Sequence, residues 1–148
     1  MVSIRKMRKS DVDILFNIAL LAFQPDSEKY GMYPPLLRIE QKKFLPPLKF
    51  GKVLIVDDVI VGGAFVLAFG KKGVLGSIFL DPDQQGKGYG RQAMLAIEKL
   101  YPKVSRWKLE TPAESYGLHK FYESLGYVKT GEMEDRGMRG FVYEKIID

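Results

Sequence analysis

The chain has 148 residues, of which 46% are hydrophobic and 28% are charged, a composition typical of one soluble globular domain over residues 1–148. It contains no cysteine, which excludes disulfides, thiolate metal sites and a cysteine nucleophile and favours a reducing cytoplasm. The net charge of +5 favours an anionic partner, but the 23 Lys and Arg residues are scattered without a long basic block, so no nucleic acid partner is expected.

The N-terminal segment MVSIRKMRKSD is basic but is not followed by the apolar stretch of a secretory signal peptide. The longest apolar run nearby, IALLAF, is too short to span a bilayer. We therefore expect no association with a membrane.

The first predicted elements are a strand and a helix. Residues 2–7 alternate like a strand, and Ser10 with Asp13 forms a capping-box pattern at the start of a helix. Residues 25–47 contain five prolines and several aromatic residues around a short helix expected at 36–44. We interpret this segment as a cover that faces the substrate.

The middle of the chain predicts an antiparallel meander, because three β-rich runs follow one another at 52–58, 59–70 and 73–82. Helical spacing then appears at 93–100 and again at 118–125, where Gly126 ends the helix, and a strand is expected between them at 104–111. Two further strands are expected at 127–133 and 140–147. The fold class is therefore α+β, with a mixed central sheet and helices packed on it.

A glycine-rich stretch, QGKGYG, lies between the strand that ends at Leu80 and the following helix. Its three glycines indicate an unusual backbone or the close approach of a ligand, and the N-terminus of a helix suits a phosphate. A solvent-exposed turn is the alternative. The stretch does not fit the dinucleotide pattern, which requires a glycine where Arg91 stands, and it does not fit the nucleotide triphosphate loop.

What remains is the pattern Q-x-x-G-x-G, formed by Gln85, Gly88 and Gly90. It resembles the [RQ]-x-x-G-x-[GA] loop of the GCN5-related N-acetyltransferases, the GNAT family. A second segment, FYESLGY at 121–127, is similar to the F-Y-E-x-x-G-[FY] segment on the last helix of that family. The resemblance covers essentially the whole chain and implies a mixed, mostly antiparallel sheet of about seven strands flanked by about four helices.

The resemblance implies that acetyl-coenzyme A is the cosubstrate. Ile78, Phe79 and Leu80 would then offer backbone groups to the pantetheine arm, and one N–H would face the thioester oxygen, where it could stabilise negative charge. The residues that would surround the pyrophosphate are Gln85, Gly86, Lys87, Gly88, Tyr89, Gly90 and Arg91. Lys87 and Arg91 would add side-chain contacts, or they would be solvated surface charges.

By the same resemblance, Tyr122 protonates the departing thiolate, although its helical spacing also fits a core residue. His119 is either a group that contacts the cofactor or polarises Tyr122, or a surface residue. Ser115 stands seven residues before Tyr122, where many family members have Asn, and it either replaces that contact with pantetheine or caps the helix.

Glu110 is the candidate general base for the amine, with Asp81 and Glu40 as alternatives. No metal is implied. The predicted function is transfer of the acetyl group to a primary amine, on a small molecule or a protein, by direct attack in a ternary complex. A non-catalytic acyl-CoA-binding module of the same fold is the alternative.

A serine hydrolase is the less favoured alternative, because AESYG at 113–117 is one residue from a nucleophile elbow but lacks the acid and the distant histidine of a triad. The acceptor amine and the oligomeric state stay open, with a homodimer among the options.

Overall fold

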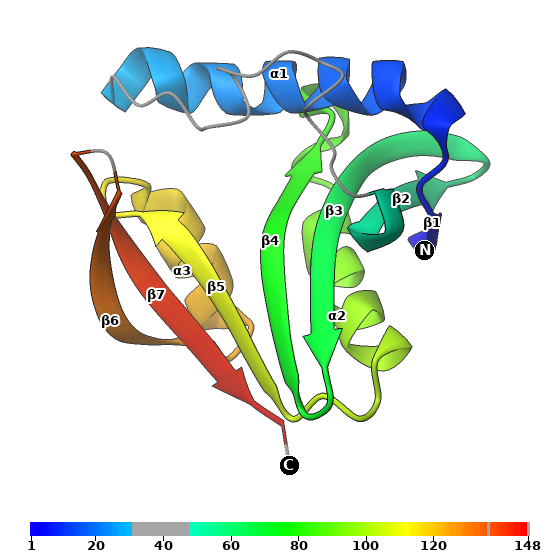
Figure 1. Cartoon of the computed structure of the whole chain (residues 1–148). Coiled ribbons are helices and arrows are strands. Elements are labelled where there is room, and N and C mark those ends of the chain that lie inside the picture. The colour runs from blue at the N-terminus through cyan, green and yellow to red at the C-terminus, as the bar shows by residue number, and fades with distance from the viewer. Residues whose placement is uncertain (31–47, 136, 148) are drawn as a thin grey trace. The chain divides into compact units, whose positions relative to one another are not determined.

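The computed structural model describes residues 1–30, 48–135 and 137–147. The sheet contains seven strands in the order β1-β2-β3-β4-β5-β7-β6 within the described ranges (Figure 1). The strands are β1 (Ser3–Lys6), β2 (Gly51–Val56), β3 (Val59–Phe69), β4 (Lys72–Leu80), β5 (Arg106–Pro112), β6 (Val128–Asp135) and β7 (Met138–Ile146). The α-helices of these ranges are α1 (Val12–Tyr30), α2 (Tyr89–Leu100) and α3 (Tyr116–Ser124), and the short 3-10 helices are η1 (Lys9–Asp11), η4 (Leu48–Phe50) and η5 (Pro82–Gln84).

This architecture confirms the predicted α+β class and the mostly antiparallel sheet. The registers of β1 with β2, β2 with β3, β5 with β7 and β6 with β7 are antiparallel, and β4 pairs with β5 in parallel. The short helix predicted at 36–44 lies outside the described residues.

The chain divides into two compact units. The first unit comprises Met1–Val66 and Ser77–Leu100, and the second comprises Leu67–Gly76 and Tyr101–Asp148. Both β3 and β4 therefore contribute residues to each unit. The expectation of a single domain over residues 1–148 stays a prediction.

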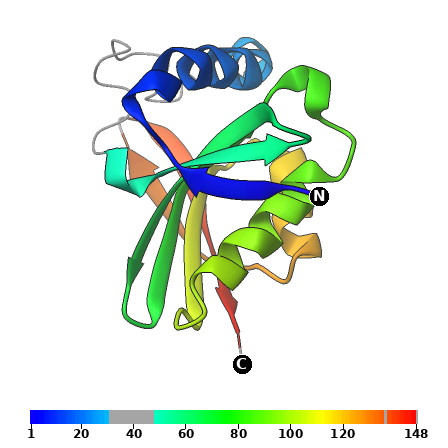
Figure 2. The same cartoon turned by 90° about the vertical axis from the view of Figure 1, so that its right-hand side faces the viewer.

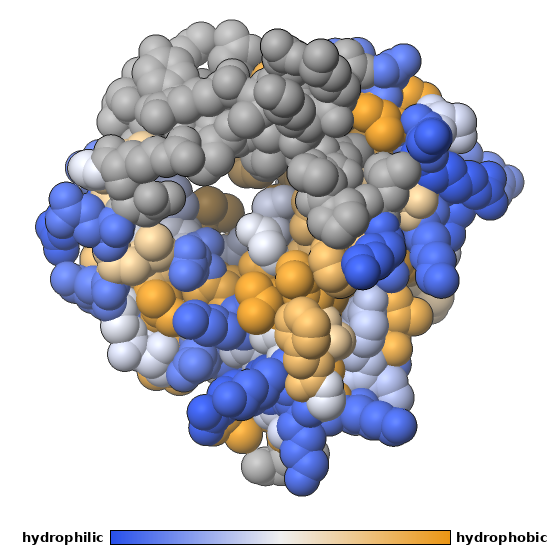
Figure 3. Space-filling view, in the orientation of Figure 1, coloured by the Kyte–Doolittle hydropathy of each residue, from blue (hydrophilic) through white to orange (hydrophobic). Residues whose placement is uncertain are grey.

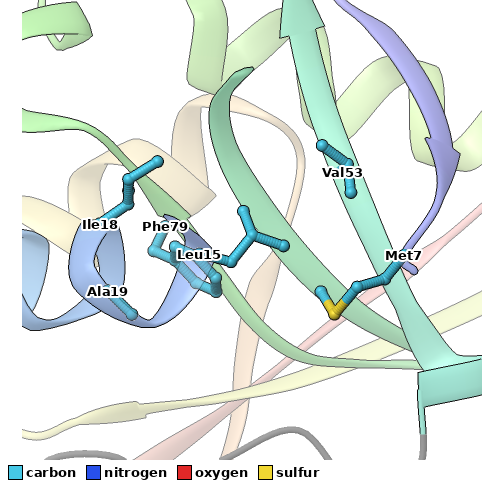
Figure 4. Packing of buried hydrophobic residues seen from close by; sticks show 6 residues of the cluster. All are labelled: Met7, Leu15, Ile18, Ala19, Val53 and Phe79. Carbon is cyan, nitrogen blue, oxygen red and sulfur yellow. The ribbon is translucent and has the colours of Figure 1, made fainter. Parts of the chain in front are cut away.

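In the first unit, α1 packs on one face of the strands. Leu15, Ile18 and Ala19 from α1 are buried together with Met7, Val53 and Phe79 (Figure 4). Each of these side chains is at most 7% exposed. Burial of a Leu, Ile or Phe side chain contributes about 1.5–3 kcal/mol relative to exposure, so this cluster holds α1 on the sheet.

The other face of the same strands is covered by α2, which lies beside β1 (Figure 2). Ala93 of α2 is buried with Val2, Leu54 and Val61, and Ile78, Leu80 and Tyr89 pack against this second cluster. Alternate residues of β4 thus face different helices, because Phe79 packs toward α1 and its neighbours pack toward α2.

The start of α1 differs from the prediction. The Asp11 carboxylate accepts a hydrogen bond of 2.8 Å from the Arg8 backbone N–H and two from the Arg5 guanidinium, at 2.8 and 2.9 Å. Arg8 is therefore the N-cap, with only its backbone N–H bonded to the Asp11 carboxylate, and Ser10 lies inside the short helix η1. The strand before the helix supplies Arg5, a tertiary partner that local spacing does not reveal.

In the second unit, α3 lies on one face of β5 and β7 (Figure 1). The burial of β5 alternates, with Trp107, Leu109 and Thr111 buried and the residues between them exposed. Rings of α3 contact rings of β7, including His119 with Phe141 at 5.0 Å between centroids. Aromatic rings therefore form part of the core of this unit, together with aliphatic side chains.

Candidate functional site

The strands of the first unit follow the order β1-β2-β3-β4 across the sheet. The last residues of β4, Ser77–Leu80, therefore belong to the last strand of that unit. A Cβ at Gly62 in β3 would lie 2.1 Å from the Phe79 carbonyl oxygen, so that carbonyl faces β3. The N–H of Asp81 also donates to a β3 carbonyl, at 2.8 Å. Because backbone groups alternate along a strand, those of Ile78 and Leu80 face the side away from β3.

This alternation refines the expectation that three consecutive residues offer backbone groups to a ligand. The carbonyl of Phe79 lies against Gly62, while Ile78 and Leu80 have their backbone groups on the outer side. The Leu80 carbonyl already accepts a hydrogen bond of 3.3 Å from Gln85 Nε2. Within this strand end, Ile78 is therefore the residue best placed to pair with an extended amide chain.

The turn from β4 into α2 is held by its own side chains. The Asp81 carboxylate accepts a hydrogen bond of 3.0 Å from the Asp83 N–H and so caps η5. Gln85 bonds back to Leu80, which ties the loop to the end of the strand. Asp81 is therefore occupied as a cap, which weakens it as an alternative general base.

The glycines of this turn adopt a backbone that favours glycine. Gly86 and Gly88 have φ of +79° and +82°, and a Cβ on either would meet no atom of the described residues within 4 Å. The first intrahelical bond of α2 runs from the Gln92 N–H to the Gly88 carbonyl at 3.1 Å. The N–H groups of Tyr89 and Gly90 thus precede Gln92, the first intrahelical donor, and lie beside open space that an anion could enter.

Side chains around the turn differ in what they can contribute. Lys87 and Arg91 are exposed, and Lys87 Nζ donates to Gln84 Oε1 at 3.2 Å. Tyr89 is half-buried and packs against the core cluster on the α2 side. The positive side chains can therefore move to a bound phosphate without disturbing the core.

In the second unit, the segment FYESLGY forms the end of α3. Gly126 has φ of +97°, its N–H donates to the Glu123 carbonyl at 3.1 Å, and the Tyr127 N–H donates to the Tyr122 carbonyl at 3.1 Å. These two bonds make a Schellman motif, and the rings of Tyr122 and Tyr127 pack at 5.9 Å. Glycine and the flanking aromatic residues thus fix the backbone of Tyr122.

Tyr122 is buried, with 7% of its surface exposed. Its ring contacts those of Phe121, Tyr127 and Tyr143 at 5.3, 5.9 and 6.5 Å between centroids. Burial raises the pKa of its phenol to about 12, so the hydroxyl is protonated at neutral pH. Tyr122 is thus a core residue by packing, and it also carries a proton that it could donate.

His119 is 7% exposed, which excludes the interpretation of this residue as a surface histidine. Its Nε2 lies 2.9 Å from the Pro112 carbonyl oxygen. Because a carbonyl can only accept, Nε2 carries the hydrogen.

Ser115 precedes α3 at the N-cap position, but its side chain makes no capping hydrogen bond. Its Oγ and the Oγ1 of Thr111 are buried and have no partner among the described residues. An unpaired buried hydroxyl costs about 1–3 kcal/mol, so each is available to a ligand that reaches it. Sequence reasoning missed Thr111, and only its buried position on β5 distinguishes it.

Glu110 is exposed on β5, opposite Val142 in the register with β7. The alternative base Glu40 lies outside the described residues. The glycine turn belongs to the first unit, and Glu110, Ser115 and Tyr122 belong to the second.

Two further features of the described part of the chain concern metals and membranes. Its His, Asp and Glu side chains form no group of three or more that could hold a metal ion. None of its helices is long and apolar enough to cross a bilayer. Hydrophilic and hydrophobic residues intermingle on the face shown in Figure 3.

Residues 13–127 match the model of the family described as the acetyltransferase (GNAT) family. No curated protein sequence matches the chain. A similar solved structure is the PaiA N-acetyltransferase of Thermoplasma acidophilum in complex with coenzyme A, at 19% identity and TM-score 0.80 over 99% of each chain. The ribosomal-protein-S18-alanine N-acetyltransferase of Escherichia coli is 19% identical with TM-score 0.77, over 100% of this chain and 95% of that chain.

An acetyltransferase of the same family from Streptococcus agalactiae is 16% identical with TM-score 0.84, over 99% of this chain and 96% of that chain. At these identities the three likenesses show a shared fold.

Proposed function

The chain belongs to the acetyltransferase (GNAT) family, and on this premise we propose that it transfers the acetyl group of acetyl-coenzyme A to a primary amine. Enzymes of this family are acyl-CoA-dependent transferases. The amine nitrogen attacks the thioester carbonyl within a ternary complex, a C–N bond forms, and the C–S bond breaks. The thiolate accepts a proton, and the amine loses one to a base.

The observation that carries this proposal is the turn from β4 into α2. Two glycines with positive φ leave open space directly before a helix N-terminus, which is the arrangement that binds phosphate. We assign the pyrophosphate to the N–H groups of residues 86–91, with Lys87 and Arg91 as side-chain contributors. The PaiA N-acetyltransferase, which shares the fold, is crystallised with coenzyme A.

The pantetheine arm is assigned to the side of β4 that faces away from β3, because an extended amide chain can pair with the backbone of a strand there through hydrogen bonds. Ile78 would supply most of these bonds, since the Leu80 carbonyl is already used by Gln85. Ser115 and Thr111 are proposed as hydroxyl contacts for the cofactor because both are buried and unpaired within the described residues. His119 is not assigned a direct contact, since its Nε2 is held by Pro112.

Tyr122 is proposed as the catalytic residue that faces the sulfur. A pKa of about 12 keeps the phenol of Tyr122 protonated. Because an ordinary thiol has a pKa of about 8.5, full transfer of the proton from this phenol to a thiolate would be unfavourable by roughly 4–5 kcal/mol. The phenol therefore first stabilises charge on sulfur by a hydrogen bond. Complete transfer requires the bound substrates to lower the phenol pKa.

Glu110 is proposed as the group that receives the amine proton, directly or through water, because it is an exposed carboxylate on β5, the strand that leads into α3. The acceptor is a primary amine of a small molecule or a protein. One similar structure is a ribosomal-protein alanine acetyltransferase, so a protein N-terminus belongs in any screen of acceptors.

A screen of amines with acetyl-coenzyme A, followed by release of free thiol, tests the proposed activity. Tyr122→Phe keeps the packed ring and removes only the hydroxyl, so its turnover should fall about 10²- to 10⁴-fold while its affinity for acetyl-coenzyme A stays near wild type. Binding of acetyl-coenzyme A without amine-dependent thiol release would identify a non-catalytic module. Normal turnover of the variant would remove Tyr122 from the mechanism.

A further inference from the structure

The Pro112 carbonyl at the end of β5 accepts two hydrogen bonds from the start of α3. The backbone N–H of Ser115 donates at 3.1 Å, and His119 Nε2 donates at 2.9 Å. Both lone-pair directions of the oxygen are thus used by groups from one helical turn. The side chain of His119 fastens α3 to the strand that precedes it.

Packing alone does not explain a histidine at this position. His119 is 7% exposed, and its ring lies 5.0 Å from Phe141 and 5.8 Å from Tyr143. An apolar side chain would fill the same aromatic surroundings without the cost of burying a polar ring. Such an apolar side chain would lack the N–H group that His119 donates to the Pro112 carbonyl.

His119 also lies one helical turn before Tyr122, and both rings contact Tyr143. The centroid of the Tyr143 ring lies 5.8 Å from that of His119 and 6.5 Å from that of Tyr122. The Tyr143 hydroxyl donates to Glu123 of α3 at 3.3 Å, which holds the shared ring against the helix. A displacement of His119 would therefore also displace Tyr122, through the backbone of α3 and through the Tyr143 ring.

The two ends of α3 are fixed by different devices. The Schellman motif holds the C-terminal end, where the Tyr127 N–H bonds to the Tyr122 carbonyl. That motif fixes the backbone of Tyr122 and does not involve the other end of the helix, where the Ser115 N–H donates to the Pro112 carbonyl. The bond from His119 to Pro112 adds a side-chain contact there, one helical turn before Tyr122.

We propose that His119 is a positioning residue for Tyr122: its hydrogen bond to the Pro112 carbonyl and its contact with Tyr143 hold the Tyr122 phenol in the orientation that the reaction requires. This inference rests on the proposed role of Tyr122 in acetyl transfer. It assigns His119 no contact with substrate and no proton transfer.

The test uses two substitutions of His119 in the full chain. His119→Phe keeps a flat ring and removes the donor, and the Pro112 carbonyl keeps its bond from Ser115, so the fold should survive. His119→Gln replaces the ring with a flexible side chain whose terminal N–H₂ can reach the same carbonyl. We expect His119→Phe to lower turnover about 10- to 100-fold with unchanged affinity for acetyl-coenzyme A, and His119→Gln to restore most of that loss.

A double-mutant cycle with Tyr122→Phe separates positioning from general stability. If His119 acts through the phenol, His119→Phe should cost nothing further once the Tyr122 hydroxyl is absent. An equal loss in both backgrounds, no loss in either, or a His119→Gln variant that is folded but as slow as His119→Phe would overturn the inference.

A second measurement decides the inference if the wild-type protein releases no thiol with any amine. Alkaline titration of Tyr122, followed by NMR of its ring protons with Tyr122→Phe as the reference, reports its environment without turnover. A phenol pKa that falls toward 10 in His119→Phe supports the positioning role. A phenol that titrates as in wild type overturns it, whatever the outcome for the proposed activity.

Discussion

Gly88 and Gly70 form a matched pair for a substitution experiment. Gly88 has φ of +82° in the turn before α2, and Gly70 has φ of +61° in the turn between β3 and β4. Within the part of the chain that the structure describes, a Cβ at either position would meet no atom within 4 Å. Gly88→Ala and Gly70→Ala therefore impose a similar backbone strain without a clash, and they differ only in the site that they disturb.

The strain of an alanine at positive φ is about 1–2 kcal/mol, so both variants should lose a similar amount of stability. If the turn at Gly88 binds the pyrophosphate, a Cβ there also occupies the open space that the phosphate enters. The loss of one hydrogen bond from a backbone N–H to a charged oxygen is worth about 1.5–3 kcal/mol. The dissociation constant of Gly88→Ala should thus rise about 10- to 100-fold.

Isothermal titration calorimetry with acetyl-coenzyme A measures the affinity, and thermal unfolding measures the stability of the same preparations. Gly70→Ala should bind like wild type despite its lower stability. Equal affinities of the two variants would refute the assignment of the pyrophosphate to this turn, and the glycines would then serve only the backbone geometry.

Three further predictions concern stability. Gly62→Ala should destabilise the protein by about 2–3 kcal/mol in urea unfolding, because its Cβ would lie 2.1 Å from a backbone carbonyl oxygen. The control Gly117→Ala in α3 places a Cβ that meets no described residue within 4 Å, so it should be neutral or stabilising by up to about 1 kcal/mol. The pKa of Asp11 is held below 3.8 mainly by its hydrogen bond with Arg5. The contribution of Asp11 to the free energy of unfolding is therefore present above pH 3.8 and is lost as the pH falls through the lower pKa of the folded state. Asp11→Asn should cost about 2 kcal/mol at neutral pH, and denaturant titrations at several pH values should show a smaller loss of stability in acid. The pKa of Tyr122 is raised from 10.0 to about 12. Its contribution to the free energy of unfolding is therefore complete below pH 10 and falls by about 1.4 kcal/mol per pH unit as the pH rises toward 12. Urea unfolding at alkaline pH should show that Tyr122→Phe lacks this loss.

The sequence by itself determined the features that depend on local spacing. Alternation and helical periodicity predicted the seven strands and the helices of the described ranges, and two motifs in the right order predicted a family that the match over residues 13–127 confirms. Gly126 ends α3 as predicted, because a Schellman motif is built from neighbouring residues alone. The turn before α2 was predictable for the same reason, since a cluster of glycines carries its own backbone requirement.

Only the tertiary structure decided which groups these elements bury or leave accessible. Phe79 and Ile78 are adjacent in sequence, yet the pairing of β4 with β3 turns the carbonyl of Phe79 toward Gly62 and the backbone groups of Ile78 the other way. The sequence was consistent with His119 as either a surface residue or a site residue. The packing of α3 on β7 buries it against Phe141. Burial likewise raises the pKa of Tyr122, and one of the rings that it contacts, that of Tyr143, is distant in sequence. Burial and strand register depend on which segments meet, and the spacing of residues within one segment does not contain that information.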